Sequence, residues 1–78
     1  MKIKVLGSGC TKCKLLEQKL LQLKETNQLA FEIEKVTQLN DIMAYGVMMT
    51  PGLVINEKVV SSGKVPKDEE ILKWIQEN

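Results

Sequence analysis

Histidine is absent from this 78-residue chain, and aromatic side chains are scarce. The aromatic residues are Phe31, Tyr45 and Trp74. So few aromatics argue against a surface on which nucleic-acid bases would stack. The net charge is only +1 and the lysines are spread along the sequence, so no basic patch for nucleic acid or for a membrane surface is evident.

Long apolar runs are missing as well. No segment approaches the ~20 apolar residues that a membrane-spanning helix needs. Near the N-terminus, Ile3, Val5 and Leu6 are interrupted by lysines and followed by Gly7, which is too short a run for a secretory signal peptide. We therefore expect a cytoplasmic protein with no membrane and no nucleic-acid partner.

No repeat, low-complexity tract or linker divides the sequence. Its length and its hydrophobic content of 44% fit one domain over residues 1–78. This is near the size at which a single hydrophobic core is only just sufficient. We expect a monomer.

The sequence holds two cysteines, Cys10 and Cys13. They follow an apolar run that ends at glycines, and a leucine-rich helical pattern follows them. A strand that leads through glycines into a Cys-x-x-Cys at the start of a helix is typical of redox-active dithiols. Side chains at i and i+3 of a helix are neighbours about 5–6 Å apart, so a small adjustment brings the two sulfurs to disulfide distance.

Physical arguments favour thiol–disulfide exchange over a structural role for this pair. The closed ring is so small that it would stabilise the fold by only about 2 kcal/mol. The unpaired N–H groups and the dipole at a helix N-terminus favour a thiolate at Cys10. Lys12 and Lys14 either add positive charge there or simply form a solvated helix face. We predict that Cys10 is the nucleophile and that Cys13, one turn inside and less exposed, is the resolving thiol.

The hydrophobic pattern predicts an α/β protein with the element order β-α-β-α-β-β-α. Strands are expected over residues 2–6, 30–36, 52–55 and 58–61, and helices over residues 10–25, 37–45 and after Pro66. Thr37 is expected to cap the second helix, Gly46 to end it, and Asn56-Glu57 to form a tight turn. The last helix is expected to bury Ile71, Leu72, Trp74 and Ile75.

A proline opens the third expected strand, in Met48-Met49-Thr50-Pro51-Gly52. Because proline has no N–H to donate to a sheet, it belongs at the start of a strand or on an edge. Taken alone, Pro51 would be an ordinary trans proline.

We interpret Met43, Met48 and Met49 as core residues, with an adaptable partner surface as the alternative for the last two.

The element order, with Cys-x-x-Cys opening the first helix and Thr50-Pro51 opening the third strand, resembles the thioredoxin fold. The expected form is minimal, with a central four-stranded mixed sheet flanked by three helices. More closely, the chain resembles the short prokaryotic thioredoxin-like proteins called small redox-active disulfide proteins. The residues that carry this resemblance are 7–13, 45–47, 50–51 and 59–66, and it covers essentially the whole chain.

The resemblance implies dithiol–disulfide exchange with protein substrates, with Cys10 attacking and Cys13 resolving. It also implies that Pro51 is cis and lies against the disulfide, since an X–Pro bond reaches the cis form at a cost of only about 0.5–1 kcal/mol. The backbone of Thr50 would then pair with an extended substrate segment. Thr11 and Lys12 are further expected substrate contacts. No cofactor beyond the disulfide is implied, and a flavin-dependent thioredoxin reductase is the expected electron donor.

Two departures from larger relatives stand out. The first strand offers only Lys2 and Lys4 where thioredoxins carry a buried carboxylate, so resolution by Cys13 is expected to depend on solvent or on the partner. Residues 61–64 lack the Gly-Gly pair and the acid that glutaredoxins use for glutathione. This weakens glutathione as a substrate without excluding it.

The main alternative is a soft-metal module, because two thiolates suit Cu(I) or Zn(II). Such domains finish on a strand and usually carry methionine two residues before the first cysteine, whereas this chain ends on an expected helix and has Ser8 there. Without histidine, two thiolates also leave a tetrahedral zinc site half filled. A non-catalytic adaptor is disfavoured because both thiols are present.

Overall fold

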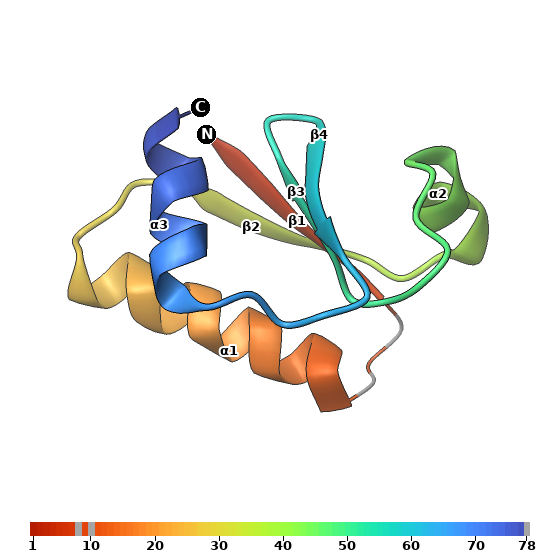
Figure 1. Cartoon of the computed structure of the whole chain (residues 1–78), viewed down its shortest axis with the longest axis horizontal. Helices are drawn as coiled ribbons and strands as arrows, with labels where there is room; N and C mark the ends of the chain where they lie inside the picture. Colours follow the sequence, from red (N-terminus) through yellow and green to blue (C-terminus); the bar gives the residue numbers. More distant parts are fainter. Residues whose placement is uncertain (8, 10, 78) are drawn as a thin grey trace.

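The computed structural model describes residues 1–7, 9 and 11–77. The elements follow the predicted order β-α-β-α-β-β-α (Figure 1). They are β1 (Lys2–Leu6), α1 (Thr11–Thr26), β2 (Glu32–Val36), α2 (Leu39–Ala44), β3 (Gly52–Ile55), β4 (Lys58–Ser62) and α3 (Asp68–Glu77). The predicted fold class, a four-stranded mixed sheet with three helices, is confirmed.

The sheet has the strand order β2-β1-β3-β4. β1 and β2 are parallel, which requires a crossover, and α1 supplies it. β3 is antiparallel to both of its neighbours, β1 and β4. Helices α1 and α3 lie on one side of the sheet and α2 lies beyond the other side (Figure 1).

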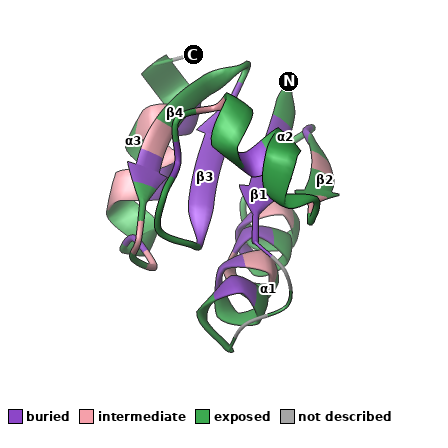
Figure 2. Ribbon diagram, turned by 90° about the vertical axis from the view of Figure 1, so that its right-hand side faces the viewer, coloured by how far each residue is buried: buried purple, intermediate pink, exposed green. Residues whose placement is uncertain are grey.

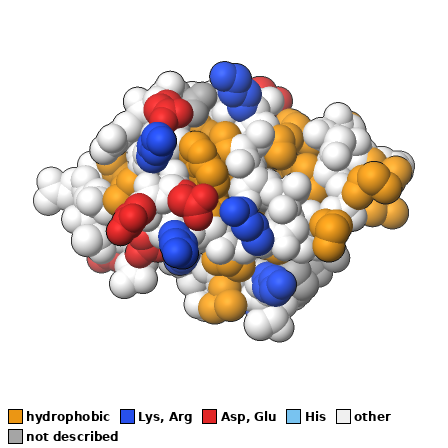
Figure 3. All heavy atoms as spheres, in the orientation of Figure 1, with side chains coloured by type: hydrophobic (Ala, Val, Ile, Leu, Met, Phe, Trp, Pro, Cys, Tyr) orange, Lys and Arg blue, Asp and Glu red, His pale blue; other side chains and the backbone are white. Residues whose placement is uncertain are grey.

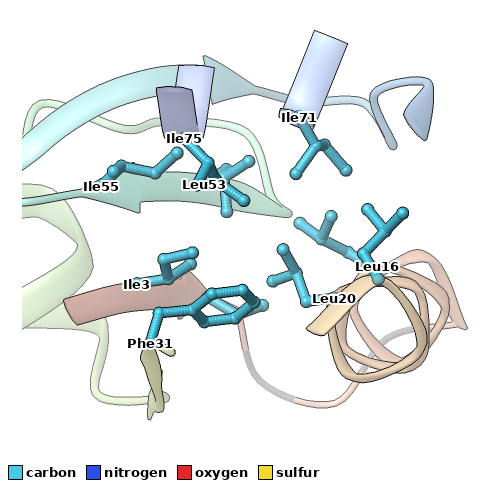
Figure 4. Packing of buried hydrophobic residues seen from close by; sticks show 10 residues of the cluster. Ile3, Leu16, Leu20, Phe31, Leu53, Ile55, Ile71 and Ile75 are labelled. Atoms are coloured by element: carbon cyan, nitrogen blue, oxygen red, sulfur yellow. The ribbon is translucent and has the colours of Figure 1, made fainter. Parts of the chain in front are cut away.

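Two clusters of buried apolar side chains hold the layers together. The larger one lies between the sheet and the pair α1 and α3, where Leu16 and Leu20 face the strands (Figure 4). The smaller one lies beneath α2 and consists of Leu6, Ile42, Val47 and Val54. Every residue of β3 is buried, as the central position of this strand requires (Figure 2).

The predicted ends of the helices are largely confirmed. α1 ends where expected, because both the backbone N–H and the side-chain amide of Asn27 donate to the Leu23 carbonyl at 3.0 and 3.1 Å. Gly46 follows α2 with φ +79°, and its N–H donates to the Met43 carbonyl at 2.8 Å. Asn56 and Glu57 adopt positive φ in the β3–β4 turn.

Capping of α2 by Thr37 is wrong. The helix starts at Leu39, with Gln38 in extended conformation at the N-cap and no side-chain cap hydrogen bond. The chain leaves β2 at Val36 and takes Thr37 and Gln38 to reach the helix, so the threonine lies too early to cap it.

The interpretation of the methionines as core residues is also wrong. Met43, Met48 and Met49 are 57%, 92% and 69% exposed. Ile42 and Val47 fill the small cluster beneath α2 instead, and this leaves the neighbouring methionines on the outside. In α3, Ile71 and Ile75 are buried as predicted, whereas Leu72 and Trp74 are only half-buried against the core.

Within the described ranges, none of the helices combines the length and the apolar character that crossing a membrane would take.

Candidate functional site

The candidate site is built around Gly7, directly after β1. Gly7 is buried, and its N–H donates to the Val36 carbonyl at 2.9 Å. A Cβ atom at this position would overlap the Cys13 sulfur and would lie 3.5 Å from the Thr50 Cβ. The absence of a side chain at Gly7 therefore lets α1 and the segment before β3 approach the same point of the backbone.

Cys13 lies in the first turn of α1 and is buried, as predicted for the resolving thiol. It shares its face of the helix with Leu16 and Leu20, which anchor that face to the sheet. The Cys13 sulfur is part of a disulfide. The predicted nucleophile, Cys10, lies outside the described residues, and its role stays a prediction.

The Thr50–Pro51 segment also approaches Gly7, since the Thr50 Cβ lies 3.5 Å from the same Cβ position. The peptide bond between these residues is cis, which confirms the expectation drawn from the resemblance. Pro51 is buried and its carbonyl accepts a hydrogen bond from the Gly63 N–H at 2.9 Å, while Thr50 is exposed. The structure thus brings Thr50 and Cys13 together around Gly7.

Thr11 and Lys12 are exposed at the start of α1, close in sequence to the buried Cys13. They are placed where a partner approaching the first turn of α1 would meet them. Their predicted contact with substrate stays a prediction.

An exposed apolar surface adjoins Thr50. Met48 and Met49 project into solvent here, and Met49 lies over Gly63, where an added Cβ would come within 3.2 Å of the Met49 Cβ. Figure 3 shows apolar side chains exposed at the α2 end of the molecule, on the right, and further apolar side chains among the lysine and acidic side chains over the rest of this face. The alternative interpretation of Met48 and Met49, as an adaptable surface beside the site, is the one that agrees with their exposure.

A hollow of about 270 Å³ opens beside Cys13. Among the residues that line it are Gly7, Cys13, Lys14, Glu17, Lys35 and Thr37. Glu17 and Lys35 form an ion pair, with 3.1 Å between Oε2 and Nζ. The sequence analysis did not identify either residue. For Glu17 a signal exists, because its i, i+4 spacing from Cys13 places both side chains on the same face of the helix.

A second polar cluster lies on the opposite face of the sheet. The ammonium group of Lys4 is 2.8 Å from Glu57 Oε1 and donates to the Tyr45 hydroxyl at 2.6 Å, and this hydroxyl donates to Glu57 Oε2 at 3.1 Å. The hydrogen bond from Lys4 is the main cause that lowers the pKa of Glu57, and the bond to Glu57 is likewise the main cause that raises the pKa of Lys4. Tyr45 therefore connects Lys4 on β1 with Glu57 in the β3–β4 turn.

Successive residues of a strand face opposite sides of the sheet. Val5 faces the larger core cluster and Leu6 the smaller one, so Lys4 points away from the side on which Cys13 lies. The Lys4 cluster therefore ties α2 to the sheet and does not belong to the site.

In the part of the chain that the structure describes, no three cysteine, aspartate or glutamate side chains gather in a way that could hold a metal ion.

Comparison with known proteins agrees with this geometry. Residues 1–76 match the family model described as a thioredoxin domain. A protein of Methanothermobacter thermautotrophicus named thioredoxin is 32% identical over 73 residues, which cover 94% of this chain and 95% of that protein. A second protein named thioredoxin, from Methanocaldococcus jannaschii, is 36% identical over 69 residues, covering 88% and 79% respectively. With its fold, its disulfide beside Thr50–Pro51 and these matches, the chain belongs to the thioredoxin domain family.

Proposed function

We propose that this protein is a thiol–disulfide oxidoreductase that reduces or oxidises disulfides of other proteins through Cys10 and Cys13. Membership of the thioredoxin family implies disulfide oxidoreductase activity. The observation that carries the proposal is the disulfide-bonded Cys13, whose sulfur packs against Gly7 beside the exposed Thr50.

The reaction in the reducing direction takes two steps. The Cys10 thiolate attacks a substrate disulfide, forms a mixed disulfide and releases one substrate sulfur as a thiolate. The Cys13 thiolate then attacks the Cys10 sulfur, which closes the disulfide and releases the second substrate thiolate. Two electrons pass from the dithiol to the substrate.

The burial of Cys13 supports this division of roles. Its side chain is only 4% exposed, so a sulfur on another protein has little access to it. A cysteine so placed is suited to attack a sulfur already held at the site. Thr50, exposed beside it, is the proposed backbone partner for an extended substrate segment, with Thr11 and Lys12 as flanking contacts.

The oxidised protein needs an electron donor for the next cycle. A flavin-dependent thioredoxin reductase is our proposed donor, and protein disulfides are the proposed substrates. The cytoplasmic location and the monomeric state predicted from the sequence belong to the same proposal.

Trapping experiments test the roles of the two cysteines. Cys13→Ser protein should attack a disulfide and accumulate as a stable mixed disulfide with its partner, whereas Cys10→Ser protein should form none. The adduct is measured by mass spectrometry under non-reducing conditions. Adducts from Cys10→Ser but not from Cys13→Ser would reverse the assignment.

Metal content separates this function from a soft-metal module. The anaerobically purified wild-type protein should carry no stoichiometric metal and should turn over a protein disulfide. Stoichiometric bound copper or zinc without turnover would overturn the proposal.

A further inference from the structure

The proton acceptor for the resolving thiol lies on α1. We propose that the Glu17 carboxylate, held in place by Lys35, takes the proton of Cys13 in the resolving step. This inference rests on the proposed function, since it assigns a role within that reaction. It replaces the expectation that resolution depends only on solvent or on the partner.

The spacing along α1 places Glu17 near Cys13. Side chains at i and i+4 of a helix lie on the same face, about 5–6 Å apart at their Cβ atoms. Both residues line the same hollow of about 270 Å³, which is large enough for a water molecule to bridge them. Among the described residues around this hollow, Glu17 supplies the only carboxylate.

A second element fixes the direction of the Glu17 side chain. Lys35 lies on β2 opposite Val5, on the face of the sheet that α1 covers. Its ammonium group contacts the carboxylate at 3.1 Å, and Glu17 is only 26% exposed although it stands on the side of a surface helix. The ion pair thus keeps the carboxylate against the sheet, where the hollow lies.

The charges that face Glu17 come from two elements. Lys14 on α1 and Lys35 on β2 both line the hollow and are positively charged. The other lining residues near β1, Val5 and Gly7, carry no charge. In β1, Lys4 points to the opposite face of the sheet and forms an ion pair with Glu57. β1 carries no acidic side chain, and the carboxylate among the described residues that line the hollow comes from α1.

The proposed step balances as follows. In the mixed disulfide, the Cys13 thiol gives its proton to the Glu17 carboxylate, directly or through a water, as its sulfur attacks the Cys10 sulfur. The bond between Cys10 and the substrate sulfur breaks, and the substrate leaves as a thiolate that takes a proton from solvent. Glu17 then returns its proton to solvent.

A two-phase reaction separates this step from the initial attack. Reduced protein is mixed with excess dithiobis(nitrobenzoate), which releases one coloured thiolate when Cys10 attacks and a second when Cys13 resolves. In Glu17→Gln protein the first phase should stay within about twofold of the wild type, while the second slows at least about tenfold near neutral pH, as for loss of a general base. The deficit should shrink as the pH approaches about 8.5, where solvent deprotonates an ordinary thiol.

Glu25→Gln is the matched control, because Glu25 is an exposed acid near the other end of α1. It removes the same charge and should leave both phases unchanged. Glu17→Asp should recover part of the second phase. Thermal melts check that all variants fold, which is expected since a partly exposed ion pair contributes little to stability.

The outcomes discriminate between the two proposals. An unchanged second phase in Glu17→Gln, an equal slowing in Glu25→Gln, or a slowing that does not depend on pH would overturn the role of Glu17. Absence of the first phase in the wild-type protein would instead overturn the proposed function.

Discussion

At the scale of single residues, the site depends on one missing side chain. In Gly7→Ala protein the new Cβ would overlap the Cys13 sulfur, so the start of α1 or the end of β1 must shift. Overpacking of this kind costs typically about 1–3 kcal/mol. We expect lower stability of the oxidised protein in urea and at least a tenfold loss of disulfide turnover, about 1.4 kcal/mol at the barrier.

Gly46→Ala is the control for this change. Gly46 has φ +79° and open space around an added Cβ, so alanine there costs stability through the backbone alone, about 1–2 kcal/mol. Its turnover should stay near the wild-type value when measured below the melting temperature. Equal turnover of the two alanine variants would show that the contact at Gly7 is not needed.

The exposed methionines lead to a second prediction at this scale. Met48→Ser with Met49→Ser should raise KM for a protein disulfide roughly fivefold, since partial burial of two apolar side chains against a partner is worth about 1 kcal/mol or more. The rate with dithiobis(nitrobenzoate), which is too small to cover both side chains, should not change. Met43→Ser, on α2 and 57% exposed, is the control. A loss with both substrates would place the methionines in the chemistry rather than in docking.

At the scale of elements, α1 shows how an amphipathic pattern determines packing. Leu20 is buried and Leu21 is 50% exposed, although the two are adjacent. Leu20→Ala should lower the free energy of unfolding by about 2–5 kcal/mol, since it leaves a cavity under the sheet. Leu21→Ala should change it by no more than about 0.5 kcal/mol. Urea denaturation of the oxidised proteins measures both values, and similar losses would mean that α1 is rotated from the position described.

The cluster of Lys4, Tyr45 and Glu57 joins three elements, namely β1, the end of α2 and the β3–β4 turn. Folding lowers the pKa of Glu57 from its ordinary value of 4.5, mainly through the hydrogen bond from Lys4. The stabilising contribution of Glu57 is therefore complete above that value and is lost as the pH falls through the lower pKa of the folded state.

Glu57→Gln should remove this contribution. The variant should be less stable than the wild type at neutral pH, and the difference should shrink below about pH 4.5. Thermal melting from pH 7 to pH 3 measures the effect, with Glu25→Gln as an exposed acid for comparison. A constant difference across this range would contradict the role of the ionised carboxylate.

At the scale of the whole molecule, element order and fold class were predictable because they depend on local patterns. The alternation in residues 2–6 and the leucine spacing of α1 each indicate which face is buried. The continuous apolar run 52–55 indicates a strand that is buried on both faces. The Glu17–Lys35 pair was not predictable in this way, because it depends on how α1 crosses β2. The methionines were misjudged for a related reason: apolar character alone does not say whether a neighbour such as Val47 already fills the core.

The two faces of the sheet are unequally supported. α1 and α3 share the larger cluster, while α2 has six residues, one buried side chain and no side-chain cap. Segments with few buried contacts open locally at a lower free energy than the whole molecule. The loop from Gly46 to Thr50, which leads from α2 into the site, belongs to this weaker side.

Amide hydrogen exchange should therefore divide the molecule. The amides of β1 and β3, which are central in the sheet and buried, should exchange only through global unfolding, with opening free energies that follow urea stability. The amides of α2 should exchange several kcal/mol more easily, on the scale of local opening. Tyr45→Phe, which removes hydrogen bonds to Lys4 and Glu57, should speed exchange in α2 without speeding it in α1. If α2 were protected as strongly as β3, the loop before Pro51 would be as rigid as the core. Substrates would then have to fit a fixed surface at Met48 and Met49 rather than one that adjusts to them.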